Sequence, residues 1–358
     1  MINVNINIPG KEYPIFITSD YKDLGRYIKE HCGEGKIVVV TDQNVDEFQG
    51  DACMGGLVDS GLDVCDIVIK AGEDQKNLAT IEEIYSYLLG KNVDRSATLV
   101  ALGGGVIGDI TGFVAATFLR GIDFVQVPTT ILSQADSSVG GKVGVDFKGE
   151  KNIIGSFYQP KLVYINVKSI ETLPVREVKA GLAEVIKHGI IRDADFFNYV
   201  SDNIENIFKF DSDVLQYIAE QDCLIKGKVV ETDEKEAGLR AILNFGHTFG
   251  HAIESAYDFK MLHGECVSLG IVAAFNMALE LDMAKQKDAD LVSETLEKAG
   301  LPIKLPDIDI EKVYAHMLHD KKMKSGKLKF VLPKKIGEVE FYSTDDAKLI
   351  KSVLKTLK

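Results

Sequence analysis

The stretch ALGGGVIGDITGF, residues 101–113, does most to predict the fold of this chain. It follows an apolar run and opens a helical pattern, so its glycines form a turn between a strand and a helix. Gly103, Gly105 and Gly108 match the pattern G-x-G-x-x-G, in which backbone N–H groups can approach a diphosphate at a helix N-terminus. Roughly half of the turns with this pattern are expected to bind no ligand. The prediction of a diphosphate site therefore needs support from other residues.

Short apolar runs alternate with helical patterns on both sides of this turn. Ile81, Ile84 and Leu88, for example, recur at the spacing of one helix face. Strands that are separated by helices form crossover units, which predicts an α/β domain with a mostly parallel sheet, a variant of the Rossmann fold. The predicted strands are residues 4–8, 15–17, 36–41, 64–69, 97–102, 124–127 and 162–165.

The pattern changes near Pro174, after which almost every segment up to about Gly300 is predicted to be helical. We therefore expect an α/β domain over residues 1–175 and an all-α domain over residues 176–358. One short strand, residues 328–332, is expected in the lysine-rich tail. The predicted helices are residues 176–191, 213–232, 247–256 and 265–281.

Composition restricts the classes of function. The 358 residues include 41 lysines and arginines against 54 acids, a net charge of −13, which argues against binding to nucleic acid or to an anionic membrane. No run approaches the roughly 20 apolar residues of a membrane span, and the first residues do not resemble a signal peptide. The five cysteines are odd in number and form no CxxC pair, so a reduced, cytoplasmic protein is expected.

Histidines and one acid predict a metal site in the helical domain. His247 and His251 lie one helical turn apart in NFGHTFGHAIE, His263 follows in LHGE, and Glu184 precedes them in GLAEVIKHG. Imidazoles and a carboxylate are ligands of catalytic zinc, which keeps one open position. Spacing alone leaves open which three of these four residues coordinate.

Several cations and one acid are candidates for binding charged ligands. Asp42 ends a predicted strand, where an acid can bind a ribose, which supports a dinucleotide in a variant geometry. The long polar loop of residues 128–160 contains Lys142, Lys151 and Asn152, which suit phosphate or carboxylate oxygens. Further cations in the helical domain indicate a small substrate with more than one negative charge, although solvated helix faces also carry such residues. These cations are Lys187, Lys226 and Arg240.

Five long motifs, taken together, resemble the 3-dehydroquinate synthase family of sugar-phosphate cyclases. In chain order, the motifs are GGGVIGDITGFVAATFLRGI, PTTILSQADSSVGGKVGVDFKGEKNIIGSFYQP, ETLPVREVKAGLAEVIKHGII, DEKEAGLRAILNFGHTFGHAIE and LHGECVSLGI. The similarity runs over essentially the whole chain, and five motifs in order are far more specific than one glycine turn.

The resemblance implies an NAD- and zinc-dependent lyase, with cobalt as an alternative metal. It would convert 3-deoxy-arabino-heptulosonate 7-phosphate, a sugar phosphate, to 3-dehydroquinate and phosphate in the shikimate pathway of aromatic amino acid biosynthesis. Transient oxidation by NAD, phosphate elimination, re-reduction and an intramolecular aldol closure are the implied steps. A homodimer is implied as well, because Arg120 in FLRGI resembles a residue that reaches the partner subunit's site.

The resemblance also implies a role for individual residues. The implied metal ligands are Glu184, His247 and His263, which makes His251 a substrate contact. The implied NAD contacts are Asp42, Glu73, Lys76, Gly104, Gly105, Val106, Asp109, Thr129, Thr130, Lys142, Lys151, Thr172 and Leu173. The implied substrate contacts are Asp136, Lys142, Asn152, Lys187, Lys226, Arg240, Asn244 and His251. Lys321 and Lys322 match a segment near the phosphate.

Three other functions remain as alternatives. Another sugar-phosphate cyclase would use the same cofactors on a substrate without a carboxylate, and Arg240 beside Asn244 favours the carboxylate substrate. A metal-dependent polyol dehydrogenase would release NADH into solution. A catalytically inactive nucleotide-binding or scaffold protein would need neither the metal ligands nor the cations.

Overall fold

A computed structural model describes residues 1–323 and 326–358, with the side chains of all of these except residues 319–323. The chain forms two compact units. The first comprises Met1–Leu173 and Phe210–Lys235, and the second comprises Pro174–Lys209 and Glu236–Lys358. Lys321 and Lys322, for which the resemblance implies a place near phosphate, lie outside the residues whose side chains are described.

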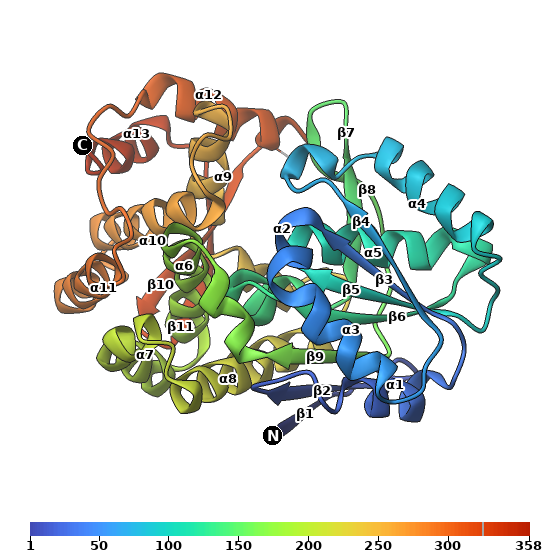
Figure 1. The fold of residues 1–358 in the computed structure, drawn as a ribbon. Coiled ribbons are helices and arrows are strands. Elements are labelled where there is room, and N and C mark those ends of the chain that lie inside the picture. Colours follow the sequence, from blue (N-terminus) through green and yellow to red (C-terminus); the bar gives the residue numbers. More distant parts are fainter. Residues whose placement is uncertain (324–325) are drawn as a thin grey trace. The chain divides into compact units, whose positions relative to one another are not determined.

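A seven-stranded sheet forms the centre of the first unit, in the order β1-β2-β9-β6-β5-β3-β4 (Figure 1). Six strands are parallel, and only β1 pairs antiparallel with its neighbour in this sheet. The predicted mostly parallel α/β domain is therefore confirmed. The strands are β1 (Ile2–Ile6), β2 (Tyr13–Thr18), β3 (Ile37–Asp42), β4 (Val64–Ile69), β5 (Thr98–Gly103), β6 (Asp123–Pro128) and β9 (Leu162–Asn166).

Helices cover both faces of this sheet, which is why its central strands are continuous apolar runs. On one face, α1 (Leu24–Cys32) and α3 (Asp51–Val58) pack on side chains such as Val39 and Val100. On the other face, α4 (Leu78–Gly90) and α5 (Gly105–Thr117) pack on the alternate residues of the same strands, such as Val38 and Leu99.

The strand order places a topological switch point between β3 and β5. From β3 the chain moves outward to β4, and from β5 it moves the opposite way to β6 and β9. Ligands of open α/β sheets bind beyond the carboxyl ends of strands at such a point. Here those ends are Asp42 and Gly103, and β3 and β5 are direct neighbours with Val40 opposite Ala101.

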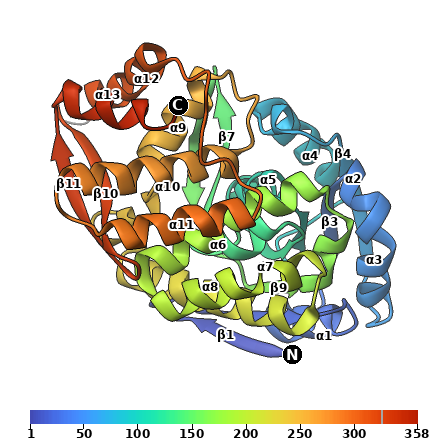
Figure 2. The ribbon, with the colours of Figure 1, turned by 90° about the vertical axis from the view of Figure 1, so that its left-hand side faces the viewer.

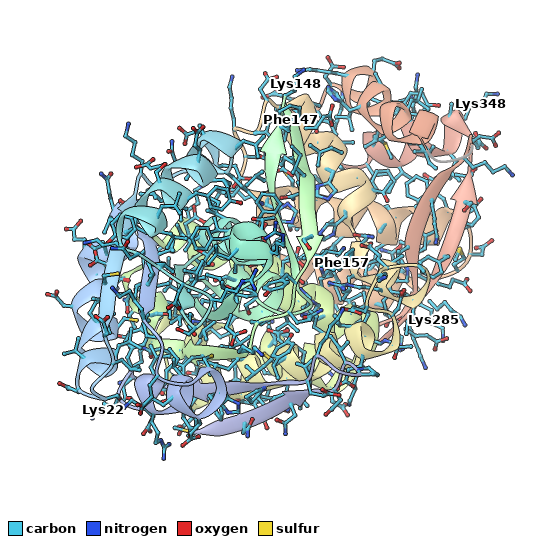
Figure 3. The ribbon with its side chains drawn as sticks, turned by 90° about the vertical axis from the view of Figure 1, so that its right-hand side faces the viewer. Lys22, Phe147, Lys148, Phe157, Lys285 and Lys348 are labelled. Carbon is cyan, nitrogen blue, oxygen red and sulfur yellow. The ribbon has the colours of Figure 1, made fainter. Side chains whose placement is uncertain are left out.

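The segment of residues 128–160, expected to be a long loop, contains regular structure. After one turn of π-helix, η4 (Ser133–Ser137), it forms an antiparallel hairpin of β7 (Lys142–Phe147) and β8 (Glu150–Phe157). Phe147 and Lys148 lie at its turn, and Phe157 lies at its other end (Figure 3). The turn signals were present in Lys148-Gly149, but the many glycines obscured the strand pattern. Val143 and Val145 anchor the hairpin in the core.

One helix that follows the predicted domain boundary at residue 175 nevertheless belongs to the first unit. Helix α8 (Ser212–Thr232) belongs to the first unit, although it follows two helices of the second. It packs on β1 and β2, and a Cβ on Gly227 would lie 2.6 Å from Ile6 Cδ1. Glu231 Oε1 accepts a hydrogen bond of 2.9 Å from Asn7 Nδ2. Helical periodicity identifies such a helix but not the surface on which it packs.

The second unit is mainly helical, with α10 and α11 side by side (Figure 2). It also contains an antiparallel pair of strands, β10 (Leu328–Lys335) and β11 (Glu338–Thr344). The predicted helical domain is therefore confirmed, with the addition of β11, because only the first of these two strands was expected. Its helices are α6 (Val175–Arg192), α7 (Ala194–Phe208), α9 (His247–Ala256), α10 (His263–Glu280), α11 (Gln286–Lys298), α12 (Ile310–Met323) and α13 (Ala347–Lys355).

Within the described residues, no helix combines the length and apolar character needed to cross a membrane.

Candidate functional site

Three helices of the second unit hold the predicted metal ligands. Glu184 lies in the buried middle of α6, while His247 and His263 are the first residues of α9 and α10. Gly246 has φ 78°, a left-handed conformation that favours glycine, and this turn starts α9 at His247. A Cβ on Gly264 would lie 1.9 Å from the carbonyl oxygen of Ala180, so only glycine allows α10 to approach α6 this closely.

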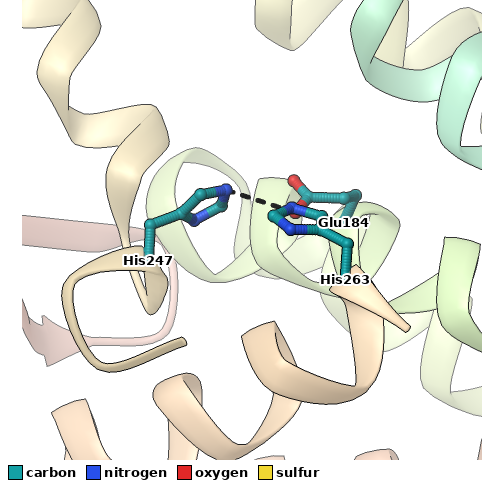
Figure 4. A group of neighbouring side chains, drawn as sticks. All are labelled: Glu184, His247 and His263. Carbon is teal, nitrogen blue, oxygen red and sulfur yellow. Dashed lines mark ion pairs between the residues drawn. The ribbon is translucent and has the colours of Figure 1, made fainter. Parts of the chain in front are cut away.

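The donor atoms of Glu184, His247 and His263 converge (Figure 4). Nε2 of His247 and Nε2 of His263 each lie 3.5 Å from Glu184 Oε1, and the three donor atoms are within 4.8 Å of one another. Tetrahedral ligands about 2.1 Å from a zinc ion are separated by about 3.4 Å. The spacing therefore suits a small divalent ion.

The opposite ring nitrogens of both histidines contact hydrogen-bond acceptors. Nδ1 of His247 lies 3.0 Å from the carbonyl oxygen of Phe245, and Nδ1 of His263 lies 3.5 Å from Glu254 Oε2. A proton on Nδ1 leaves the lone pair on Nε2, the atom that faces Glu184. Metal-binding histidines characteristically donate their other N–H group to a carbonyl or carboxylate in this way.

Electrostatics keep the carboxylate ionised although it is fully buried. Burial favours the neutral acid, but Lys187, His247 and His263 together hold the pKa of Glu184 well below its ordinary value. Burial, reinforced by the charge of Lys187, lowers the pKa of His247 to about 3. Burial acts in the same direction on His263, yet contacts with Glu184 and Glu254 outweigh it and raise its pKa to about 9. His263 must therefore lose a proton before it can bind a metal.

The donor set fits zinc by its chemistry. Neither oxygen of Glu184 accepts a hydrogen bond from the residues that the structure describes, and Lys187 Nζ forms an ion pair with Oε2. Lys187 thus compensates the buried charge at Oε2, while Oε1, which faces Nε2 of both histidines, is placed to ligate a divalent ion. His251, Glu254 and His263 form a second, overlapping group of possible ligands. In this group the two histidines face the carboxylate of Glu254 with Nδ1 and not with Nε2, and the side chain of His251 is 58% exposed.

The switch point of the first unit brings together the predicted dinucleotide contacts. Asp42 caps the short helix α2 (Gln43–Val45), because its Oδ1 accepts hydrogen bonds from the N–H groups of Asn44 and Val45. Next to it, β5 ends at Gly103 and α5 begins at Gly105. The N-terminus of a helix as long as α5 presents N–H groups that lack partners within the helix and favour an anion.

Small residues keep the space before α5 open. A Cβ on Gly104 would lie 3.2 Å from Thr130 Cγ2, and a Cβ on Gly105 would lie 3.3 Å from Ser137 Oγ. Thr129 donates its backbone N–H to the carbonyl oxygen of Gly103. Its buried Oγ1 has no hydrogen-bond partner among the described residues. An orphaned hydroxyl beside a glycine turn fits a polar ligand such as a dinucleotide.

Two ion pairs link other predicted NAD contacts. Lys76 Nζ lies 2.6 Å from Asp109 Oδ2, and Lys151 Nζ lies 3.6 Å from Glu73 Oε1. Burial raises the pKa of Asp109, and the neighbouring Lys76 limits this rise. Thr172 contributes more to local structure, since its hydroxyl accepts a hydrogen bond from Gln49 Nε2 at 3.1 Å. Of the other predicted contacts, Val106 lies in α5, and Leu173 ends the first of the two segments that make up the first unit.

The predicted substrate contacts divide between the two units. Lys142 and Asn152 lie on the β7–β8 hairpin, where Asn152 has φ 54° and donates its backbone N–H to Asp146 Oδ1. Lys226 was expected to join the cations of the helical domain, but α8 places it in the first unit. There its Nζ lies 2.6 Å from Asp136 Oδ1.

The second unit contains the other predicted substrate contacts. Lys187 is 1% exposed and pairs with Glu184, one turn earlier on α6. Arg240 is 2% exposed in the 3-10 helix η6 (Leu239–Asn244). At the end of that helix, Asn244 Nδ2 donates a hydrogen bond of 2.6 Å to Glu236 Oε1.

Sequence reasoning missed Glu254. Its carboxylate is 4% exposed and contacts His251 and His263. The signal was its position in HTFGHAIE, seven residues after His247 and therefore on the same helix face.

Comparisons with known proteins identify the family. Residues 66–180 match the family model 3-dehydroquinate synthase N-terminal, and residues 181–323 match 3-dehydroquinate synthase C-terminal. A curated 3-dehydroquinate synthase of Acetivibrio thermocellus is 58% identical over 100% of this chain and 99% of its own length. One from Ruminiclostridium cellulolyticum is 53% identical over 99% of each chain.

Solved structures share the fold at low sequence identity. ValA (2-epi-5-epi-valiolone synthase) from Streptomyces hygroscopicus subsp. jinggangensis, solved with NAD+ and Zn2+ bound, has a TM-score of 0.89 at 24% identity over 96% of each chain. A glycerol dehydrogenase from Schizosaccharomyces pombe has a TM-score of 0.67 at 17% identity, covering 96% of this chain and 88% of its own. Cyclases and dehydrogenases thus share this architecture, and the full-length relatives discriminate between them: the chain belongs to the 3-dehydroquinate synthase family.

Proposed function

We propose that this chain converts 3-deoxy-arabino-heptulosonate 7-phosphate to 3-dehydroquinate and phosphate, with NAD+ and Zn2+ as cofactors and Co2+ as a possible substitute. The observation that carries the proposal is the convergence of Glu184, His247 and His263 in a chain that shares 58% identity with a 3-dehydroquinate synthase over its full length. The reaction belongs to the shikimate pathway of aromatic amino acid biosynthesis.

The chemistry explains why such an enzyme needs both cofactors. Phosphate elimination removes a carbon-bound proton, which is acidic enough only next to a carbonyl group. When bound, NAD+ would accept and later return a hydride, and Zn2+ would polarise the hydroxyl oxygen that becomes this carbonyl. The contribution of the protein is to orient the substrate and compensate its charges.

We assign the cofactors to separate units of the chain. Glu184, His247 and His263 would hold the metal through one carboxylate and two Nε2 atoms, a donor set known from catalytic zinc sites. The N-terminus of α5 would bind the diphosphate of NAD+, and Asp42 would bind a ribose from the adjacent strand end. The other proposed NAD contacts are Glu73, Lys76, Val106, Asp109, Thr129, Thr130, Lys142, Lys151, Thr172 and Leu173.

The substrate carries a carboxylate and a phosphate, and the cations of the site match these charges. We assign Lys142 and Arg240 to the carboxylate, because arginine can form paired hydrogen bonds with it. We assign Asn152, Lys187 and His251 to the phosphate. Asp136, paired with Lys226, and Asn244 would contact the hydroxyl groups.

We further propose a cytoplasmic homodimer in which Arg120 reaches the partner subunit's site. Leu119 and Arg120 have φ values of 49° and 69°, and consecutive left-handed residues other than glycine are unfavourable by about 1–3 kcal/mol each. Such strain is retained where a side chain must be presented in a particular direction. All five cysteines are free thiols, which supports a reducing compartment.

Phosphate release from the heptulosonate phosphate tests the function. Purified protein with Zn2+ and substoichiometric NAD+ should release one phosphate per substrate without net absorbance from NADH. A cyclase for substrates without a carboxylate would instead release phosphate from sugar phosphates that lack this group, and a polyol dehydrogenase would accumulate NADH. Either result, with no turnover of the heptulosonate phosphate, would exclude the proposed reaction.

A further inference from the structure

Glu254 is a buried carboxylate that the proposed reaction leaves without a role. It lies in the last turn of α9 and is 4% exposed. Its Oε2 is 3.5 Å from Nδ1 of His263 and 3.4 Å from Nδ1 of His251. One oxygen atom therefore contacts both a proposed metal ligand and a proposed substrate contact.

The position of Glu254 is unfavourable for helix stability. The C-terminal turn of a helix carries partial negative charge, which repels a carboxylate. Burial adds a desolvation penalty, which only charged or hydrogen-bonded partners offset. The two imidazoles are such partners, and this argues for a role in the site rather than in the stability of α9.

The geometry at His263 shows what that role would be. Its Nε2 faces Glu184 Oε1 at 3.5 Å, while its Nδ1 faces Glu254. A carboxylate that accepts the Nδ1 proton selects the tautomer with the lone pair on Nε2, fixes the ring orientation and strengthens Nε2 as a ligand. For His247 the main-chain carbonyl of Phe245 serves this purpose. At His263 the acceptor is a side chain, that of Glu254, and a substitution can therefore remove it.

We propose that Glu254 is a positioning residue that holds His263 as an Nε2 ligand of the metal and orients His251 through the same carboxylate oxygen. This rests on the proposed function only in that Glu184, His247 and His263 bind a divalent ion. Removal of a carboxylate partner of a metal-binding histidine lowers metal affinity by about 10- to 100-fold.

Metal binding without substrate tests the proposal. The wild-type protein and Glu254→Gln are titrated with Co2+ while the visible d–d bands are recorded, and Zn2+ affinity is measured by competition with a chelator. Glu254→Gln should bind Zn2+ about 10- to 100-fold more weakly, with a shifted or weakened cobalt spectrum. Glu254→Asp keeps the charge and should fall between the two. Equal affinity and an unchanged spectrum in Glu254→Gln would overturn the proposal.

Two control variants separate positioning from a general loss of stability. Glu265→Gln removes a carboxylate two residues after His263 whose partners are Arg176 and the N–H of Leu262. It should lower the melting temperature but leave Zn2+ affinity within about threefold. In a His251→Ala background, Glu254→Gln should weaken Zn2+ binding by the same factor, because the effect passes through His263. An equal loss in Glu265→Gln, or no loss in the His251→Ala background, would contradict the assigned route.

The result can be separated from the test of the reaction. A protein that binds Co2+, loses affinity in Glu254→Gln and releases no phosphate would disprove the proposed function alone. A protein that releases phosphate and binds Zn2+ equally with and without Glu254 would disprove this inference alone.

Discussion

Lys76 and Asp109 form an ion pair of 2.6 Å that joins the loop after β4 to helix α5. The lysine is 5% exposed, and the side chain of Asp109 is 18% exposed. The loop is also tied by its main chain, since the carbonyl oxygen of Lys76 accepts the N–H of Asp146 at 2.8 Å. The pair thus connects two predicted NAD contacts and shapes the region beside the glycine turn.

Lys76→Met should destabilise the protein by about 3 kcal/mol, because it leaves the Asp109 carboxylate without its countercharge. Burial already raises the pKa of Asp109, and loss of Lys76 would raise it further. A raised pKa in the folded state means that protonation favours folding, so the loss of stability should grow as pH rises from about 5 to 8. Urea unfolding at both pH values measures this.

Lys22→Met is the matched control for that experiment. Lys22 is exposed (Figure 3) and lies 3.7 Å from Asp20, so the pair is worth less than about 1 kcal/mol. A similar loss of stability in both variants would contradict the importance of the Lys76–Asp109 pair.

Glu184→Gln and His247→Ala should each lose the bound zinc and the phosphate-releasing activity, because each removes one of three ligands. His251→Ala should keep one zinc ion per chain and lose activity, since this histidine is assigned to the substrate. Elemental analysis of the purified variants together with the phosphate assay tests both statements. Wild-type zinc content in Glu184→Gln, or zinc loss in His251→Ala, would reverse the ligand assignment.

Zinc affinity should depend on pH through a single histidine. With the pKa of His263 raised to about 9, zinc must displace one proton from it at pH 7, whereas His247, with a pKa of about 3, is already neutral. The affinity should therefore fall about tenfold per unit as pH drops from 9 to 6. Calorimetry in buffers of different ionisation enthalpy should find about one proton released per ion at pH 7. Release of none, or of two, would contradict these protonation states.

Arg120 offers a test of the proposed dimer. If it serves the partner subunit's site, Arg120→Ala and His247→Ala should each be inactive alone. After mixing and subunit exchange they should recover about a quarter of the wild-type rate, because about half of the dimers are mixed and each has one intact site. If Arg120 serves its own subunit, no activity returns.

Gly264→Ala should disturb the metal centre by moving α10. The added Cβ would meet the carbonyl oxygen of Ala180 at 1.9 Å, and neither main chain can yield without shifting the helix that begins at His263. We expect a loss of more than about 2 kcal/mol in unfolding free energy and weaker zinc binding. Gly55→Ala, with no atom within 4 Å of the new Cβ, should instead be stabilised by up to about 1 kcal/mol.

The sequence by itself determined the elements with strong local patterns. Strand β4 and helix α9 begin and end where predicted. The edge strand β4 buries alternate residues, Ile67 and Ile69, and a helix repeats every 3.6 residues. The sequence motifs also identified every proposed metal ligand as a candidate. The sequence did not reveal β11, whose residues are only partly buried, or the hairpin within the segment of residues 128–160.

Only the tertiary structure decided which residues meet. Spacing left four candidate ligands open, whereas folding turns Nε2 of His247 and of His263 toward Glu184 and leaves His251 exposed. It likewise moved Lys226 to the first unit and placed Glu254 beside two histidines. Local propensity acts over a few residues, but the packing partner of a helix depends on close approaches such as that of Gly264 to Ala180, which sequence order does not encode locally.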